Sequence, residues 1–401
     1  MAERVKGVRD FAGKEAVLRQ DMSQRIRDAY KCFGFEPVET PSFEYLSLFT
    51  NKSGPGIEEQ LYSFSDKKGE KLALRPEHTI SKLRVISGNK SFTKPIKTYS
   101  IGNVWRYEDP RKARWREFIQ ADIDVFGSSN LRYDAEVIAC IDFAIKKLGL
   151  SNYMIRLSNR KVLQAILEEL EVGPIESIQV LREIDKKDKV GIDGVLKKVT
   201  ELIGSNKAQK VKLYLEGKLE PKGDGIAEIE KVTGYLKEYG IKNVFFDRSL
   251  VRGQDYYDGT IFEFEYGEGQ YSKVVFASGG RYDKLSKKFD SDLPIVGGSI
   301  GFDVVMEIAM ASATEDFSED YCVLNVDSIE KAIEIAGKLR KKGLVTDILL
   351  DNVSLSKGLE YCNAKKIRYA VIIGKKDLEK DEVTIRDLKD KKDKKIKESE
   401  I

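Results

Sequence analysis

The sequence predicts an α+β protein in which strands and helices form a large first domain, a helical insertion interrupts that domain, and a smaller α/β domain follows at the C-terminus. Extended segments fill much of the chain up to residue 160 and again after residue 243, whereas residues 161–240 have helical spacing and are rich in Lys and Glu. After residue 320, extended and helical segments alternate, which is typical of a partly parallel sheet. We therefore expect a large domain at 1–311, with the insertion at about 161–240, and a second domain at 321–401.

The N-terminal region is expected to combine short helices and strands. Its first helix has apolar residues at helical spacing and should end near Gly34. The turn-forming sequence DKKGE joins two short strands, and Pro76 suits the first turn of the helix that follows. In chain order, the expected elements are a helix at 15–32, an extended segment at 35–41, a loop at 51–56, strands at 61–64 and 71–74, and a helix from residue 76.

The rest of the chain follows the same reasoning. Gly204 and Pro221 should interrupt the helical insertion. The sequence SATEDFSED reads as a linker ahead of the C-terminal domain. In chain order, we expect a strand, a charged loop and a strand at 98–126, a helix at 134–148, the insertion, strands from 244 to 276, and alternating strands and helices at 321–373.

The composition is that of an ordinary globular protein. Charged residues make up 34% and hydrophobic residues 41% of the 401 residues, and no apolar run approaches the roughly 20 residues that span a bilayer. The start, MAERVKGVRDF, lacks the apolar stretch of a signal peptide, so we expect a cytoplasmic protein without membrane contact. The four cysteines are far apart and His78 is the single histidine, which argues against a zinc site, a disulfide framework and a Ser-His-Asp triad.

The small net charge of +3 is concentrated near the C-terminus. Residues 321–401 contain 19 Lys and Arg against 15 Asp and Glu, so the rest of the chain is close to neutral. A phosphate-rich partner would favour this end. The tail KDKKDKKIKESE is, however, more typical of a solvated, frayed terminus.

The stretch LVRGQDYYDGTIFEF places Arg252 in a run of aromatic and β-forming residues. Its guanidinium can bind a carboxylate or a phosphate through two parallel hydrogen bonds, and Tyr256 and Tyr257 add hydroxyl groups and flat apolar faces. These residue types suit a small, polar, planar substrate. An ion pair of Arg252 with Asp247 or Asp255 that only stabilises the sheet explains the local pattern equally well.

A second stretch, WRYEDPRKARWREFIQADIDVFG, predicts a hairpin that can grip a polyphosphate. Arg106, at the end of its strand, is held rigidly enough to meet a reacting phosphate, whereas Arg114 in the loop can close over a terminal one. A basic surface hairpin without a ligand explains the loop, but it explains Arg106 less well. Asp122 and Asp124 alternate on the second strand and share one face, where two acids require a ligand or a cation.

Several motifs, in order, make the chain similar to histidyl-tRNA synthetases, a family of class II aminoacyl-tRNA synthetases. LVRGQDYYDG resembles the family segment LVRGxDYYxG, RPEHT resembles RPEGT, and GGRYD matches the second histidine-specific motif. The hairpin resembles motif 2, with the Arg-x-Glu signature at Arg106 and Glu108, and residues 35–43 resemble motif 1 of the dimer interface. The resemblance implies a class II catalytic domain, an antiparallel sheet with helices, followed by an α/β anticodon-binding domain at 321–401.

This resemblance implies a homodimeric enzyme that makes histidyl-adenylate from histidine, ATP and Mg²⁺ and transfers the histidyl group to the 3′ end of histidine tRNA. It also implies residue roles by matching position. Arg106 and Arg252 would be catalytic, at the α-phosphate, and Arg252 would also meet the substrate carboxylate. Glu108 would bind adenine and Arg114 the γ-phosphate. Glu77, Thr79 and Gln120 would hold the α-amino group, and Asp124, Tyr256, Tyr257 and Tyr282 would surround the imidazole.

Two residues depart from the family pattern. His78 stands where the family has glycine, and we expect its side chain to point away from the amino-group pocket. VGGSIGFDVV aligns with motif 3 but has Val304 where an arginine over ATP is expected. The sequence leaves open which group replaces that arginine.

Two other functions are compatible with parts of the pattern. Relatives of the catalytic domain serve as non-catalytic regulatory subunits of ATP phosphoribosyltransferase, and a pseudo-synthetase that senses tRNA would keep the same folds. The intact LVRGQDYYDG and the C-terminal domain argue against the regulatory subunit, whereas Val304 argues for it.

Overall fold

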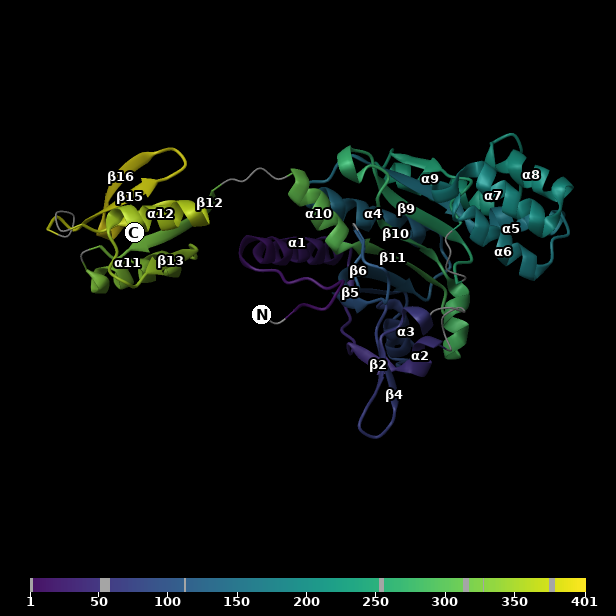
Figure 1. Cartoon of the computed structure of the whole chain (residues 1–401), viewed down its shortest axis with the longest axis horizontal. Coiled ribbons are helices and arrows are strands. Elements are labelled where there is room, and N and C mark those ends of the chain that lie inside the picture. The colour runs from purple at the N-terminus through teal and green to yellow at the C-terminus, as the bar shows by residue number, and fades with distance from the viewer. Residues whose placement is uncertain are drawn as a thin grey trace. The chain divides into compact units, whose positions relative to one another are not determined.

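The computed structural model describes residues 3–50, 58–111, 113–251, 256–312, 317–326, 328–374 and 379–401. The expected loop at 51–56 and the side chain of Arg252 lie outside these described residues. The chain forms two compact units, Met1–Ser312 and Ala313–Ile401, each with sheets of its own (Figure 1).

The first unit is organised around an eight-stranded sheet with the order β1-β5-β6-β11-β10-β9-β7-β8. All pairings from β5 to β7 are antiparallel, whereas the edge strands β1 and β8 run parallel to their neighbours. The expected antiparallel sheet is therefore confirmed. Its strands are β1 (Glu36–Pro37), β5 (Ile96–Trp105), β6 (Glu117–Phe126), β7 (Tyr153–Asn159), β8 (Val244–Phe246), β9 (Thr260–Tyr266), β10 (Val275–Arg281) and β11 (Ile295–Gly301).

Three helices cover one face of this sheet. Ala121, Ile123 and Val125 of β6 are fully buried in the same apolar cluster as residues of these helices, and the Tyr30 hydroxyl donates a hydrogen bond of 2.9 Å to the Ala121 carbonyl. Because side chains alternate along a strand, the polar residues of β6 face the opposite side. The covering helices are α1 (Gly13–Cys32), α4 (Arg132–Lys147) and α10 (Phe302–Ser312).

A small three-stranded antiparallel sheet with the order β2-β4-β3 also belongs to this unit. The strands expected on either side of DKKGE are confirmed, because Asp66 Oδ1 accepts hydrogen bonds from the backbone N–H groups of Lys68 (2.8 Å) and Glu70 (2.9 Å) and closes the turn. The elements of this region are β2 (Phe43–Tyr45), α2 (Leu46–Thr50), η1 (Glu58–Gln60), β3 (Ser63–Ser65), β4 (Lys71–Leu74) and α3 (Thr79–Gly88).

Helices follow one another between β7 and β8, in the insertion (Figure 1). Fully buried Val195, Val199 and Val211 illustrate why these segments pack, since their apolar residues recur at helical spacing. Gly204, with a φ of 79°, separates two of the helices as the sequence predicted. The helices are α5 (Arg160–Glu169), α6 (Pro174–Ile184), α7 (Lys187–Ile203), α8 (Ser205–Leu215) and α9 (Asp224–Glu238).

The second unit contains a five-stranded sheet with the order β13-β12-β14-β15-β16. Strand β12 pairs in parallel with both β13 and β14, which confirms the expected partly parallel sheet. Its elements are β12 (Ser318–Leu324), α11 (Ile329–Lys341), β13 (Thr346–Leu349), α12 (Leu355–Lys365), β14 (Ile367–Ile372), β15 (Glu382–Asp387), β16 (Lys392–Lys397) and η4 (Glu398–Glu400).

The expectation of a frayed C-terminal tail was wrong. Strand β16 pairs along its whole length with β15, and Arg386 holds Asp393 on the opposite strand through two bonds of 2.6 Å. Opposite charges across a strand pair stabilise such a hairpin, although the composition resembles that of a disordered tail. In both units, none of the described helices is long and apolar enough to cross a membrane.

Candidate active site

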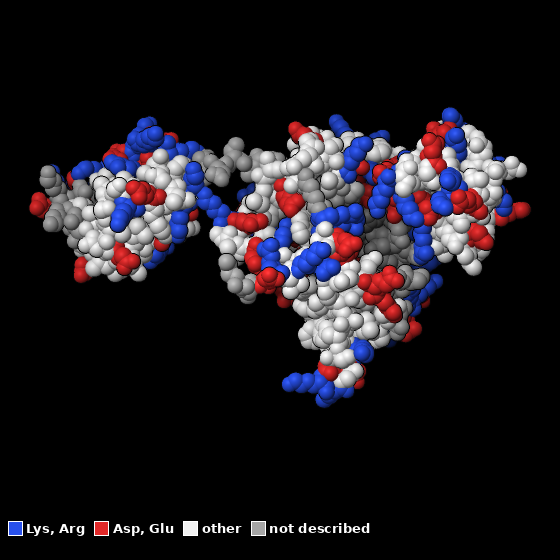
Figure 2. Space-filling model, viewed as in Figure 1, with Lys and Arg blue, Asp and Glu red and all other residues white. Residues whose placement is uncertain are grey.

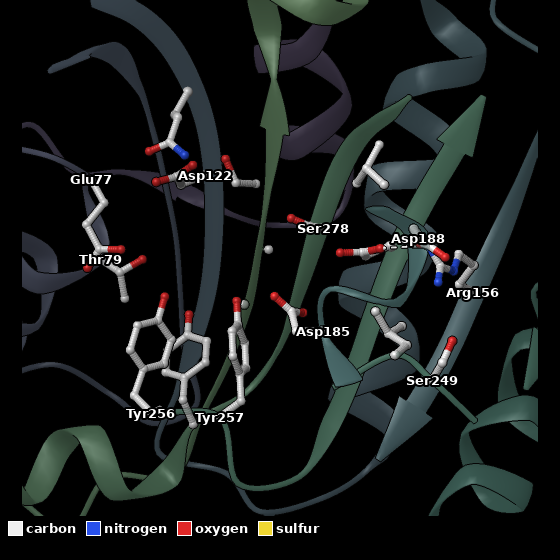
Figure 3. Close-up of a pocket in the computed structure, with 18 of the residues that line it drawn as sticks. Glu77, Thr79, Asp122, Arg156, Asp185, Asp188, Ser249, Tyr256, Tyr257 and Ser278 are labelled. Carbon is white, nitrogen blue, oxygen red and sulfur yellow. Dashed lines mark hydrogen bonds and ion pairs between the residues drawn. The ribbon is translucent and has the colours of Figure 1, made fainter. Parts of the chain in front are cut away.

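A cavity of about 530 Å³ opens on the polar face of the eight-stranded sheet. Its walls come from β6, β7, β9, β10 and β11, from residues around the start of α3, and from the junction of α6 and α7 in the insertion. Figure 3 shows Glu77 and Thr79 on one side of this cavity and Arg156 and Asp188 on the other. We call it the main cavity.

Strand β6 supplies the floor of the main cavity. Asp122 and Asp124 share one face, as predicted, and are 4% and 1% exposed. Asp122 and Gln120 line the main cavity, whereas Asp124 lies beneath it and does not. Burial raises the pKa of both aspartates, and the Lys82 ammonium opposes this rise.

Lys82, on α3, is a buried charged residue next to the expected site that the sequence analysis missed. It is completely buried, and its ammonium forms an ion pair with Asp124, whose other oxygen accepts a hydrogen bond from the Tyr282 hydroxyl. Gly297 makes this arrangement possible, because a Cβ there would collide with the Asp124 carboxylate. The i, i+3 spacing places Thr79 and Lys82 on one helix face, but this spacing alone does not distinguish a buried lysine from a solvated one.

The three residues expected to hold an α-amino group meet at one end of the main cavity. Glu77, Thr79 and Gln120 all line it, although they come from two distant segments of the chain. Burial raises the pKa of Glu77 to about 7, and the Arg106 guanidinium opposes this rise. Gln120 Oε1 is buried and accepts no hydrogen bond from any described residue. This end can therefore receive a ligand N–H group.

Three tyrosines form an aromatic wall of the main cavity, and one of them, Tyr282, contacts Asp124. The ring centroids of Tyr256 and Tyr257 are 4.8 Å apart, and those of Tyr257 and Tyr282 are 5.8 Å apart with the rings nearly perpendicular. All three line the main cavity, and Figure 3 shows the hydroxyls of Tyr256 and Tyr257 directed inward. Flat rings next to carboxylates suit a small planar group with N–H donors.

Arg106 connects the main cavity to a second one of about 200 Å³, which we call the side cavity. The Arg106 Nε–H group donates a hydrogen bond of 2.9 Å to the Pro76 carbonyl, which fixes the guanidinium just ahead of α3. The same guanidinium lies 5.3 Å from the Phe118 ring, which lines the side cavity. Arg114 also lines both cavities, but Arg106 is the cation that a hydrogen bond to the backbone holds in place between them.

The side cavity holds the rest of the expected nucleotide site. Glu108 and Arg114 line it and form an ion pair of 2.8 Å. Val304 also lines the side cavity. Its neighbour Asp303, at the start of α10, is held in place by Arg9, by Arg19 and by the backbone N–H group of Ile119. Among the described residues, the arginines that line the side cavity are 106 and 114.

His78 lies away from the main cavity. It is 2% exposed, its Nε2 is 3.2 Å from the Gly102 carbonyl oxygen, and it lines neither cavity. Burial lowers the pKa of His78 to about 3, so the ring is neutral. The bulkier residue in RPEHT therefore leaves the amino-group end open.

The GGRYD segment builds the sheet rather than a turn. Gly279 and Gly280 belong to β10, where a Cβ would collide with backbone oxygens of the neighbouring strands. Arg281 is 4% exposed and pairs with Asp134 of α4, and Tyr282 then enters the cavity wall. These contacts anchor the tyrosine to the sheet and helix behind it.

A second residue that sequence reasoning missed is Arg156 of β7, which lines the main cavity. Its Nε donates to Asp247 at 2.6 Å, and its Nη1 lies 3.0 Å from Asp188. Asp247 raises the pKa of Arg156 despite burial. The proposed structural partner of Arg252, Asp247, is thus already bound to another arginine.

Comparisons with known proteins identify the family to which both units are similar. Residues 7–305 match the family described as Histidyl-tRNA synthetase, and residues 319–401 match the Anticodon binding domain. A Histidine–tRNA ligase from Pyrococcus furiosus is 34% identical over 425 residues, covering 100% of this chain and 98% of that protein. One from Pyrococcus horikoshii is 33% identical, covering 97% and 95%. The crystal structure of histidyl-tRNA synthetase from a Nostoc species has a TM-score of 0.87 at 24% identity, covering 99% of this chain and 97% of that one, and shows the same fold.

Proposed function

The chain belongs to the histidyl-tRNA synthetase family and is a class II histidine–tRNA ligase, and we propose that the main and side cavities together form its active site. The enzyme uses ATP to activate histidine as histidyl-adenylate and transfers the histidyl group to the 3′ end of histidine tRNA. The observation that carries the site assignment is Arg106, which faces both cavities. An amino acid in one cavity and a nucleotide in the other would meet at this cation.

Histidine would lie along the floor of the main cavity. Its ammonium would bind Glu77, Thr79 and Gln120, whose acceptors converge at one end. Its imidazole would lie toward Asp124 and the wall formed by Tyr256, Tyr257 and Tyr282. A side chain that lacks hydrogen-bonding groups would leave these buried polar atoms unpaired, which supports selection of histidine over apolar amino acids.

Activation requires no protein nucleophile, because the carboxylate of histidine attacks the α-phosphate itself. A bond forms between a carboxylate oxygen and phosphorus, and the bond to pyrophosphate breaks. Negative charge grows on the α-phosphate, and a cation already aimed at it is worth about 3 kcal/mol in the transition state. We assign this role to Arg106, and to Arg252, which lies outside the described residues.

ATP would occupy the side cavity, with Phe118 and Glu108 beside the adenine and Arg114 at the γ-phosphate. We propose that Mg²⁺ arrives with the phosphates. The described residues contain no cluster of three or more potential metal ligands, and Mg²⁺ commonly keeps several waters and binds through substrate phosphates. The ion would supply positive charge to the leaving pyrophosphate.

We further propose that residues 1–311 form the catalytic domain, with the insertion at about 161–240, and that residues 321–401 bind the anticodon. Two compact units and the two family matches support these limits. Figure 2 shows Lys and Arg gathered near the β15–β16 hairpin of the second unit, as suits a phosphate-rich partner. The rest of the visible surface mixes both signs of charge.

We also propose a homodimer that works in the cytoplasm. The first unit exposes a group of aromatic side chains that a second copy can cover: Phe43, Tyr45 and Phe64 are 51%, 60% and 43% exposed on β2 and β3. Phe43 is the last residue of the segment that resembles motif 1, and Tyr45 and Phe64 follow that segment in the chain. Sedimentation analysis of the purified protein tests this assembly.

The regulatory-subunit reading retains one supporting observation, the apolar Val304 in the side cavity. A solved chain with TM-score 0.71 is titled an ATP phosphoribosyltransferase regulatory subunit/histidyl-tRNA synthetase. The arginines of the side cavity support catalysis instead, because a subunit that only senses histidine has no need of a cation such as Arg114 there.

The experiment is exchange of radioactive pyrophosphate into ATP by the purified chain, with each of the standard amino acids in turn. Histidine alone should support exchange, and the chain should then charge histidine tRNA. Binding of histidine without exchange would support the regulatory subunit, and binding of tRNA without either would support the sensor.

A further inference from the structure

A completely buried lysine lies beneath the histidine end of the main cavity. The ammonium of Lys82 pairs with one oxygen of Asp124, and the Tyr282 hydroxyl donates to the other. Placing a charge inside a protein is costly unless an opposite charge compensates it. The Lys82–Asp124 pair therefore fixes the charge at the bottom of the cavity.

Charged and titratable groups surround this pair from each element packed against it. The segment before α3 brings Glu77 and the neutral His78, β6 brings Asp122 and Asp124, and the end of β5 brings Arg106. Tyr282 and Tyr257 complete the set. Arg75, just ahead of α3, also interacts with Asp122. Three carboxyl groups thus face three cations, of which Lys82 is the one that forms an ion pair with Asp124. Without Lys82, the same carboxyl groups would face Arg106 and Arg75, and Asp124 would lose its ion-pair partner.

The cavity presents acceptors that no described residue satisfies. Asp122 Oδ1 and Gln120 Oε1 are buried and have no hydrogen-bond partner among the described side chains and backbone. Both residues line the main cavity, so a ligand N–H group is the expected partner. A neutral imidazole offers one N–H donor and one acceptor, whereas an imidazolium offers two donors and a positive charge.

We propose that Lys82 is a positioning residue that sets which form of histidine is bound: by compensating Asp124, it makes the cavity prefer the neutral imidazole over the imidazolium. The inference rests on the proposed histidine site, since it concerns the same cavity. An uncompensated Asp124 would attract a second positive charge, and the imidazolium would supply it. Lys82 therefore acts on specificity through Asp124, without touching the reacting atoms.

The test compares two ligands by calorimetry between pH 5 and pH 8.5. The imidazole of histidine titrates near pH ~6.5, whereas 1,2,4-triazol-3-ylalanine has a similar ring that stays neutral in this range. Protein groups that contact both ligands, including Glu77, change the two affinities equally with pH. Their contribution therefore cancels in the ratio of the two affinities. In the wild type, the affinity for histidine relative to the analogue should fall about tenfold per pH unit below the imidazole pKa, because only the neutral fraction binds.

Three variants separate charge from packing. Lys82→Met should flatten this dependence to less than about threefold per pH unit, because the imidazolium then replaces the missing cation. Lys82→Arg keeps the charge and should keep the wild-type slope. The double variant Lys82→Met/Asp124→Asn removes both charges together, and it should also recover the wild-type slope. Lys146→Met removes a lysine paired with Asp142 outside both cavities and serves as the control.

Two results would overturn the proposal. One is a wild-type ratio that does not change with pH, and the other is a folded Lys82→Met protein with the wild-type slope. If Lys82→Met does not fold, the proposal is tested by the pH dependence of the wild type and of the double variant. A flat ratio in either protein would overturn it. A wild type that binds no histidine at any pH would instead overturn the proposed function itself.

Discussion

Arg114 Nη1 lies 2.8 Å from Glu108 Oε2, and both side chains line the side cavity that we assign to ATP. The Arg114 side chain is 49% exposed, and an ion pair this open to water contributes little to stability. Breaking the Arg114–Glu108 ion pair therefore costs little free energy, and Arg114 can bind an incoming phosphate instead. The pair holds a cation at the nucleotide site before the nucleotide arrives.

Arg114→Ala should raise the KM for ATP by about 10-fold to 100-fold, because a hydrogen bond between charged groups is worth about 1.5–3 kcal/mol. The kcat at saturating ATP should change much less, since the γ-phosphate is remote from the bond that forms. Steady-state pyrophosphate exchange at varied ATP measures both. Arg84→Ala, which breaks an exposed pair with Glu44, is the control, and an unchanged KM in Arg114→Ala would refute the assignment.

Val304→Arg should lower the KM for ATP if the wild-type site lacks one cation. Val304 already faces the side cavity, and the contacts of Asp303 hold the start of α10 in place, so the new side chain should enter the site. Val304→Met has a similar reach without charge and should not lower the KM. We also expect the wild type to require Mg²⁺ steeply, since the metal would supply the missing charge. Ordinary ATP affinity and no gain from Val304→Arg would argue that valine packs there at no cost.

Glu77 should make histidine binding depend on pH near neutrality. Its pKa is raised to about 7, so the carboxylate that attracts the ammonium is lost as the pH falls below 7. The KM for histidine should rise by up to about tenfold per pH unit in that range. Glu77→Gln should bind histidine weakly at all pH values and should remove this contribution. A KM that is constant from pH 8 to pH 6 in the wild type would contradict the role.

The same raised pKa has an opposite effect on stability. The folded state holds the Glu77 proton more tightly than the unfolded chain, whose carboxyl titrates near 4.5, so ionisation between 4.5 and about 7 costs folding free energy. Glu77→Gln should therefore leave the Tm unchanged or raise it at pH 8. Thermal unfolding monitored by circular dichroism checks that a loss of activity is not a loss of fold.

Removal of residues 321–401 should spare much of the pyrophosphate exchange and greatly weaken the charging of tRNA. The cavities are lined by residues of the first compact unit, whereas the excess of Lys and Arg lies in the second. Charging at varied tRNA concentration by the full-length and truncated proteins measures the difference. Equal charging would count against an anticodon-binding role.

Much of the fold followed from the sequence because periodicity reports burial directly. Strand β6 alternates apolar and polar residues, and the structure buries Ala121, Ile123 and Val125 while it turns Gln120 and Asp122 to the cavity. The prediction of a frayed C-terminal tail was wrong for a physical reason. Its many lysines suggested solvation, but pairing with β15 and the Arg386–Asp393 contact order it.

The site was harder to predict where function depends on contacts between distant segments. The polar groups of RPEHT and of β6 were each visible, and the structure brings Glu77 and Gln120 together. Lys82 was not visible, because a lysine in an amphipathic helix normally points to water and only the tertiary structure shows it buried against Asp124. Arg156 was missed for the same reason, since its partners come from three other segments.

The most direct test of the central claim is a rapid-quench measurement of histidyl-adenylate formation by the wild type, Arg106→Ala and the Arg84→Ala control. With histidine and ATP both saturating, Arg106→Ala should slow the single-turnover rate by about 100-fold or more, because the lost contact strengthens as charge develops on the α-phosphate. The Tm should change little, and the dissociation constant of histidine should change by less than about threefold if Arg106 acts mainly in the transition state. An Arg106→Ala enzyme that is folded and forms the adenylate at the wild-type rate would contradict the account.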